Sequence, residues 1–99
     1  MAQAAIEDFL AALAVDRGAA ANTLAAYRRD LEGATGIIGP LEDATRESLA
    51  RLAQAWTDLA PASVARKASA LRQFFGYLED EGLRRDNPSA ALPRPVKRR

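Results

Sequence analysis

The fold of this chain is decided by residues 61–82, which read PASVARKASALRQFFGYLEDEG. Apolar residues recur there every three or four positions, as on one face of a helix: Val64, Ala68, Leu71, Phe75 and Leu78. A helix tolerates proline at its first position, as at Pro61, and commonly ends at a glycine such as Gly82. The stretch therefore predicts one long amphipathic helix.

Three more helices are predicted before it. The first carries one apolar stripe and should end near Gly18: Ile6, Phe9, Leu10 and Leu13. The second begins at or just before Asn22 and turns three residues inward: Leu24, Tyr27 and Leu31. We expect Gly33 and Gly36 to end it, followed by a loop at 36–40 whose isoleucines, Ile37 and Ile38, tuck under the bundle.

The third predicted helix begins after Thr45, a good N-cap residue, and buries four residues: Leu49, Leu52, Trp56 and Leu59. Asn87 followed by Pro88 predicts the start of a short fifth helix that reaches about Leu92. Three prolines keep the remaining segment extended. The sequence thus predicts an all-α fold, a small four-helix bundle with a short C-terminal fifth helix in residues 1–92 and a basic linker or tail in residues 93–99.

Composition excludes several kinds of chemistry. The 99 residues contain no cysteine and no histidine, so thiolate catalysis, histidine bases and the usual zinc ligands are absent. Neighbouring acids such as Glu7 and Asp8 diverge on a helix, and no glycine-rich phosphate loop occurs. We expect no catalytic residues, metal or cofactor. No stretch resembles a signal peptide or membrane span, so a cytoplasmic domain without membrane contact is expected.

The net charge of +1 hides an asymmetry. Residues 1–60 hold five Arg against nine acids, a net of −4, and residues 61–99 hold nine Lys or Arg against four acids, a net of +5. Such a split is compatible with an anionic partner, and solvated helix faces also produce it.

Two stretches are candidates for contact with nucleic acid. Residues 22–31 place Asn22, Thr23 and Arg28 near a helix start, where free N–H groups favour phosphate. Without other evidence, an ordinary amphipathic helix with an asparagine cap is the preferred explanation. Residues 63–73 place Arg66, Ser69 and Gln73 on the face opposite the apolar stripe. That composition suits a helix lying along a DNA groove, and it also suits a plain basic surface.

Taken together, the two stretches resemble the N-terminal, SAM-like core-binding domain of tyrosine site-specific recombinases, most closely the XerC/XerD group. The resemblance covers nearly the whole chain in order: Phe9-Leu10, Arg17-Gly18, residues 22–31, residues 63–67, residues 69–75, Tyr77-Leu78, residues 81–83, residues 86–88 and Leu92. The chain departs from the family where Ala19-Ala20-Ala21 stands in place of a serine or similar cap, where Ala60 replaces a common serine and where Ala68 replaces a frequent leucine.

This resemblance implies the upper half of a C-shaped clamp around a duplex recombination half-site, with DNA contacted by the second and fourth helices. Matching positions imply these contacts: Asn22, Thr23, Tyr27, Arg28, Ser63, Arg66, Lys67, Ser69, Arg72 and Gln73, with Lys97, Arg98 and Arg99 in the basic linker. Tyr27 also lies on the apolar stripe, which favours a core role with its hydroxyl reaching outward.

The resemblance further implies a partner catalytic domain and a sister recombinase on the adjacent half-site. Family enzymes cut DNA with a tyrosine assisted by an Arg/Lys/His/Arg/His set in that second domain, which this sequence lacks. The expected role is chromosome dimer resolution. Three alternatives stay open: the same domain from a phage, mobile-element or integron integrase; a helical protein-interaction adaptor with an exposed apolar patch around Phe74 and Tyr77; and a helix-turn-helix regulator.

Overall fold

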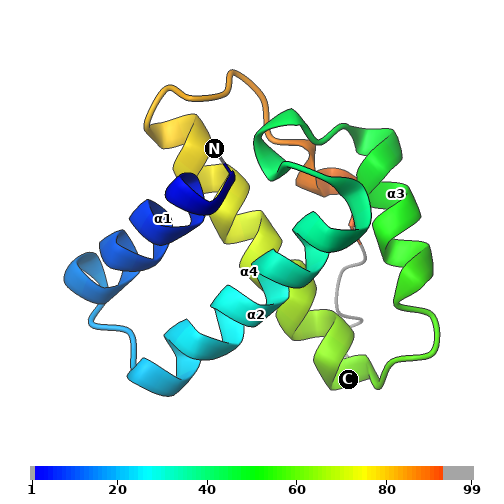
Figure 1. Cartoon of the computed structure of the whole chain (residues 1–99), viewed down its shortest axis with the longest axis horizontal. Coiled ribbons are helices and arrows are strands. Elements are labelled where there is room, and N and C mark those ends of the chain that lie inside the picture. Colours follow the sequence, from blue (N-terminus) through cyan, green and yellow to red (C-terminus); the bar gives the residue numbers. More distant parts are fainter. Residues whose placement is uncertain (1, 93–99) are drawn as a thin grey trace, which may run out of the picture.

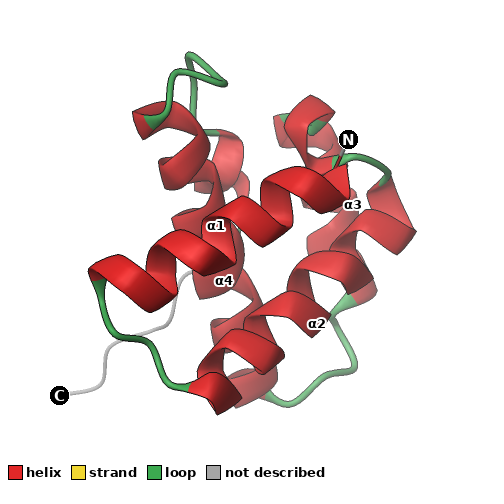
Figure 2. Cartoon of the chain, turned by 60° about the vertical axis from the view of Figure 1, so that its left-hand side comes forward, coloured by secondary structure: helices red, strands yellow, loops and turns green. Residues whose placement is uncertain are grey.

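Residues 2–92 are described by a computed structural model, and they form helices and no strand. The elements in chain order are α1 (Ala2–Asp16), α2 (Ala21–Ile38), the 3-10 helix η1 (Leu41–Asp43), α3 (Arg46–Ala55), α4 (Pro61–Asp80) and the 3-10 helix η2 (Pro88–Ala91). The α-helices pack into one bundle, as Figures 1 and 2 show. The predicted all-α four-helix fold is confirmed.

The centre of the bundle is α4, which contacts α1, α2 and η2 (Figure 1). Its buried residues lie on more than one face of the helix: Ala68, Ala70, Leu71, Phe74, Phe75 and Leu78. Phe74 packs edge-on against Phe9 of α1, with ring centroids 5.5 Å apart, and lies 5.6 Å from Phe75. A helix buried on several sides fixes the directions in which its neighbours cross it, so α4 organises the fold.

Helix ends follow the sequence closely. Gly18 and Gly82 adopt positive φ angles of 60° and 74°, as glycine does at helix C-termini. Thr45 accepts a hydrogen bond from the Ser48 backbone N–H while the Ser48 side chain accepts one from Thr45, which closes a capping box at α3. By contrast, α2 and α4 begin after Ala20 and Ala60, and neither helix has a side-chain cap.

The predicted end of the second helix at its glycines was wrong. Helix α2 runs through Gly33 and Gly36 and ends at Gly39, whose φ is 88°. Glycine inside a helix costs only about 1 kcal/mol relative to alanine, and the burial of Leu31 and Ala34 on the same helix offsets that cost. As a consequence Ile37 is exposed rather than tucked under the bundle, whereas Ile38 packs against the core.

Two smaller expectations changed. Leu49, Leu52 and Trp56 are buried as predicted, but Leu59 is exposed because α3 ends at Ala55 and the chain turns toward α4. The short fifth helix exists as the 3-10 helix η2. The Asn87 side chain caps it by accepting a hydrogen bond from the backbone N–H of Ser89.

Arg84 ties the loop after α4 to the loop after α2. One guanidinium nitrogen donates to the carbonyls of Glu42 and Ala44, at 3.1 and 2.8 Å, and the other two nitrogens donate to Asp86. The guanidinium also lies over the Phe75 ring, 5.4 Å from its centroid. Arg84 is therefore a structural cation and is not a free surface charge.

Candidate nucleic-acid interface

A buried carboxylate with two cationic partners joins α2 to α4 at Asp30. Arg66 donates from Nε and Nη2 to the two carboxylate oxygens of Asp30, at 2.9 and 3.0 Å, and Lys67 Nζ donates to Oδ1 at 3.0 Å. The Asp30 side chain is 1% exposed, the Arg66 side chain 46% and the Lys67 side chain 25%. A buried carboxylate is thus covered by two cations that reach solvent.

Electrostatics keep Asp30 ionised. Burial by itself raises the pKa of a carboxyl group, but hydrogen bonds and charge from Arg66 and Lys67 outweigh burial and hold the pKa of Asp30 below its usual value. The same hydrogen bond and charge raise the pKa of Arg66 above its ordinary value. The three groups therefore act as one cluster with a net charge of +1.

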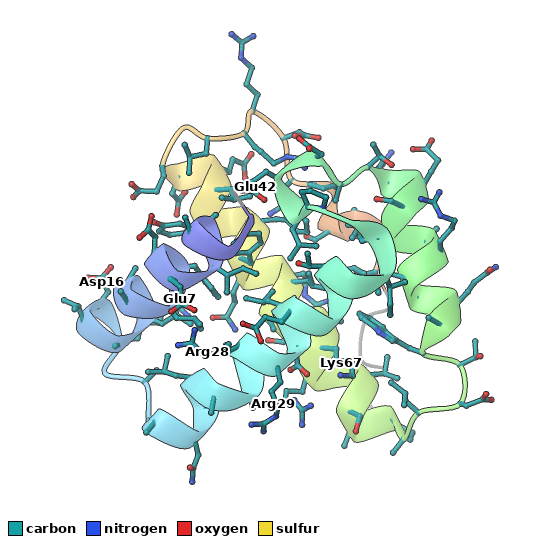
Figure 3. The ribbon with its side chains drawn as sticks, viewed as in Figure 1. Glu7, Asp16, Arg28, Arg29, Glu42 and Lys67 are labelled. Carbon is teal, nitrogen blue, oxygen red and sulfur yellow. The ribbon has the colours of Figure 1, made fainter. Side chains whose placement is uncertain are left out.

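A second ion pair involves α2, this time with α1. Arg28 Nη1 contacts Glu7 Oε2, and Figure 3 shows the two side chains pointing toward one another. The Arg28 side chain is 40% exposed and that of Glu7 44%. Both partners keep contact with water, so the pair leaves the Arg28 charge accessible from outside.

The amide group of Gln73 links α4 to α2 and to Arg17, the residue that follows α1. Its nitrogen donates to the Tyr27 hydroxyl at 3.0 Å and to Ser69 Oγ at 3.1 Å, and its carbonyl oxygen accepts from Arg17 at 3.2 Å. The Tyr27 ring packs against the core, as expected, and its hydroxyl accepts the hydrogen bond from Gln73. Gln73 is held between protein groups and is only partly free to meet a ligand.

The polar face of α4 reaches solvent and is also engaged in part by α2. Arg66 turns toward Asp30 of α2, and Gln73 toward Tyr27 of the same helix. The stripe lies along the contact between α2 and α4, because the central helix is covered on several sides. Arg66 is exposed, whereas Ser69 and Gln73 are half-buried, so DNA contact at these three residues stays a prediction.

The other predicted DNA-contacting residues are exposed or half-buried on α2 and α4, or lie outside the described residues. Asn22 and Thr23 are exposed in the first turn of α2, after the Ala20 cap. Ser63 and Arg72 are half-buried on α4. The three tail residues, Lys97, Arg98 and Arg99, lie outside the described residues.

Sequence reasoning missed Asp30 and Arg17. An acidic residue on an amphipathic helix is normally solvent-exposed, so Asp30 attracted no attention. The available signal was its place beside Leu31 and three residues after Tyr27, both on the inward face. A polar residue next to an apolar stripe is often partly buried and then needs charged partners.

The positive charge of the C-terminal part lies mostly outside the described residues. Within residues 61–92 there are five Lys or Arg against four acids, a net of +1, so most of the C-terminal excess belongs to the last seven residues. In the part of the chain that the structure covers, no helix is long and apolar enough to cross a membrane. Over the same residues no group of three or more acidic side chains could hold a metal ion.

Comparisons with known proteins agree with this architecture. Residues 6–82 match the model of the phage integrase N-terminal SAM-like domain. Tyrosine recombinase XerC of Erythrobacter litoralis is 71% identical over 98 residues, which cover 99% of this chain and 32% of that protein.

Tyrosine recombinase XerD of Rhizobium meliloti is 43% identical over 107 residues, covering all of this chain and 34% of that protein, and XerD of Caulobacter vibrioides is 42% identical over 93 residues. No solved structure gives a significant match. The chain spans about a third of the length of the first two of these relatives. It belongs to the phage integrase N-terminal SAM-like family and is similar to the N-terminal domain of XerC/XerD-type tyrosine recombinases.

Proposed function

We propose that this domain grips duplex DNA at a recombination half-site as one half of a clamp. The observation that carries the proposal is the set of solvent-reaching cations on α2 and α4, the two packed helices that meet at Asp30. Arg28 projects from α2, and Arg66 and Lys67 project from α4. Cations on adjoining helices are suited to successive phosphates of one duplex, and such contacts set position and affinity.

The rest of the proposed role extends beyond this chain. We propose that residues 93–99 begin a basic linker to a catalytic domain, and that a sister recombinase occupies the neighbouring half-site during chromosome dimer resolution. The 99 residues provide binding without catalysis, because a chain without histidine lacks two members of the family's catalytic set. Neither Tyr27 nor Tyr77 is then the nucleophile.

The adaptor alternative loses its main support. It expects an exposed apolar patch around Phe74 and Tyr77, but Phe74 is fully buried. Tyr77 is half-buried and lines a pocket between α1 and α4. The large exposed apolar residues are scattered over different elements: Val15, Ile37, Leu59 and Leu83. Scattered exposure of this kind is normal for a globular surface and gives a partner helix no continuous face.

The test is fluorescence anisotropy of a labelled duplex of about 30 base pairs, titrated with the chain at several salt concentrations. We expect affinity to fall steeply with salt. Arg28→Gln should weaken binding and reduce the slope of log K against log salt by about 0.9, the value for one phosphate contact.

The matched control is Arg51→Gln, which removes the same charge from an exposed position on α3. It should leave the slope unchanged, because α3 lies outside the proposed interface. If the wild-type chain shows no salt-dependent binding even at low ionic strength, the proposal of DNA binding by this domain is wrong. If both variants lower the slope equally, binding is a matter of net charge and the proposed surface is wrong.

A further inference from the structure

We propose that Asp30 is a positioning residue that organises Arg66 and Lys67 into a single site for one DNA phosphate. The inference rests on the proposed DNA binding and names a residue that sequence patterns do not single out. Asp30 never touches the phosphate. Its carboxylate fixes where the two cations stand.

The donors of the two cations divide between Asp30 and solvent. A guanidinium has five N–H donors, and Asp30 engages Nε and one N–H of Nη2, so three donors of Arg66 stay available. An ammonium has three donors, and Lys67 uses one on Asp30. Within residues 2–92 the hydrogen bonds and ion pairs that describe the two cations all go to Asp30, and Tyr27 adds an electrostatic interaction with Arg66. The outer edge of the guanidinium and the lysine head are therefore free for a phosphate.

Because Asp30 is buried, its carboxylate holds Arg66 and Lys67 in a defined orientation. Its side chain is 1% exposed and sits on α2, whereas both cations come from α4, so the cluster bridges the crossing of the two helices. Because the guanidinium is planar and is held along one edge, its opposite edge has a defined direction. Neighbouring residues in a helix diverge by about 100°, and convergence on one carboxylate brings Arg66 and Lys67 back together.

Glu7 offers an internal comparison. It also pairs with a candidate DNA-contacting arginine, Arg28, but it is 44% exposed and lies on a surface helix. An exposed pair of this kind is flexible and screened by salt. The geometry thus assigns positioning to Asp30 and not to Glu7, although each is a carboxylate beside a basic residue.

The DNA affinity of the Asp30→Asn variant tests the inference, because charge alone predicts tighter binding and positioning predicts weaker binding. Asp30→Asn raises the net charge from +1 to +2. If only Coulomb attraction matters, this variant binds DNA more tightly and steepens the salt slope. If Asp30 positions the cations, the variant binds more weakly despite its extra charge. We expect a loss of about two- to tenfold, as for one or two long side chains that must be ordered on binding.

The titration runs wild type, Asp30→Asn and the matched control Glu7→Gln on the same 30-base-pair duplex, with circular dichroism of each free protein at the assay temperature. Glu7→Gln makes the same charge change and should bind as tightly as wild type or more tightly. A folded Asp30→Asn protein that equals or exceeds wild type overturns the inference and leaves the proposed function standing. Wild type without salt-dependent binding overturns both.

A second variant keeps the test decisive if Asp30→Asn unfolds. Arg66→Lys retains the charge and a partner for Asp30 but replaces the two-edged guanidinium by a single ammonium. We expect a similar two- to tenfold loss of affinity with an unchanged salt slope. Arg66→Lys binding as well as wild type contradicts a site built on the guanidinium geometry.

Discussion

Two ion-pairing residues of α2, Arg28 and Asp30, lie two residues apart and differ in burial and in the helix that each faces. Asp30 faces α4, is buried and accepts three hydrogen bonds from two cations. Arg28 faces α1 and meets Glu7 at a surface where both side chains are about two-fifths exposed. Helical rotation of about 200° between the two positions sends one charge inward and the other to the rim.

Burial, and not the identity of the charges, decides how much each ion pair contributes to the stability of the fold. A buried charge must keep its partners, because losing them leaves it desolvated and uncompensated. An exposed pair replaces its partner with water at little cost. The cluster at Asp30 should therefore be needed for stability, whereas the Arg28–Glu7 pair should be lost at little cost in stability.

The largest expected effect comes from removing both partners of Asp30. Arg66→Ala combined with Lys67→Ala leaves the carboxylate buried without a cation, which should lower the free energy of unfolding by about 3–5 kcal/mol. Urea denaturation followed by circular dichroism measures it. Losing these cations therefore damages folding as well as DNA binding, so alanine substitution here cannot by itself identify a DNA contact.

Rescue separates the charge effect from lost packing. Adding Asp30→Asn to the double variant removes the buried charge, so the triple variant should recover most of the lost stability. A triple variant no more stable than the double one would show that the side-chain stems of Arg66 and Lys67, and not the ion pairs, hold α2 against α4.

Acid provides an intermediate perturbation of the same cluster. Because the folded pKa of Asp30 lies below the unfolded value of about 3.9, its stabilising contribution is fully present above that pH and is lost as pH falls through the lower folded pKa. Wild type should lose stability in this range more steeply than Asp30→Asn. Asp86, whose pKa is also lowered by its hydrogen bond from Arg84, titrates alike in both proteins and cancels in the comparison.

Equal acid sensitivity of wild type and Asp30→Asn would contradict an ionised, cation-stabilised Asp30. The measurement is urea unfolding at a series of pH values between about 2 and 6, which spans the unfolded carboxyl pKa. Glu7→Gln serves as the control, and it should follow the wild-type curve because its carboxylate is half-exposed.

Helix positions could be predicted because local signals agree with the packing. The stripe on α4, the Thr45 cap and the C-terminal Gly18 and Gly82 each act within one or two turns, and each is confirmed. The end of α2 could not be predicted, since the small helical penalty of Gly33 and Gly36 is outweighed by burial that depends on the whole bundle. Tertiary packing decided that boundary.

The candidate site was predictable only in part, because it also depends on tertiary packing. The helical period placed Arg66, Ser69 and Gln73 on one face, but which face α2 covers depends on how the helices cross. Asp30 acquires its importance only when α4 brings two cations to it across 36 and 37 residues of sequence. No short pattern contains that information.

The exposed pair between Arg28 and Glu7 should contribute least to stability. Arg28→Ala should change the free energy of unfolding by less than about 1 kcal/mol, because both partners of this pair already contact water. A double-mutant cycle of Arg28→Ala and Glu7→Ala, measured by urea unfolding, should give a coupling of about 0.2–1 kcal/mol that shrinks further at high salt. Coupling as large as that between Asp30 and its cations would mean that exposure does not separate the two pairs. Arg28 would then be a structural residue like Arg84, and its charge would be less available to DNA.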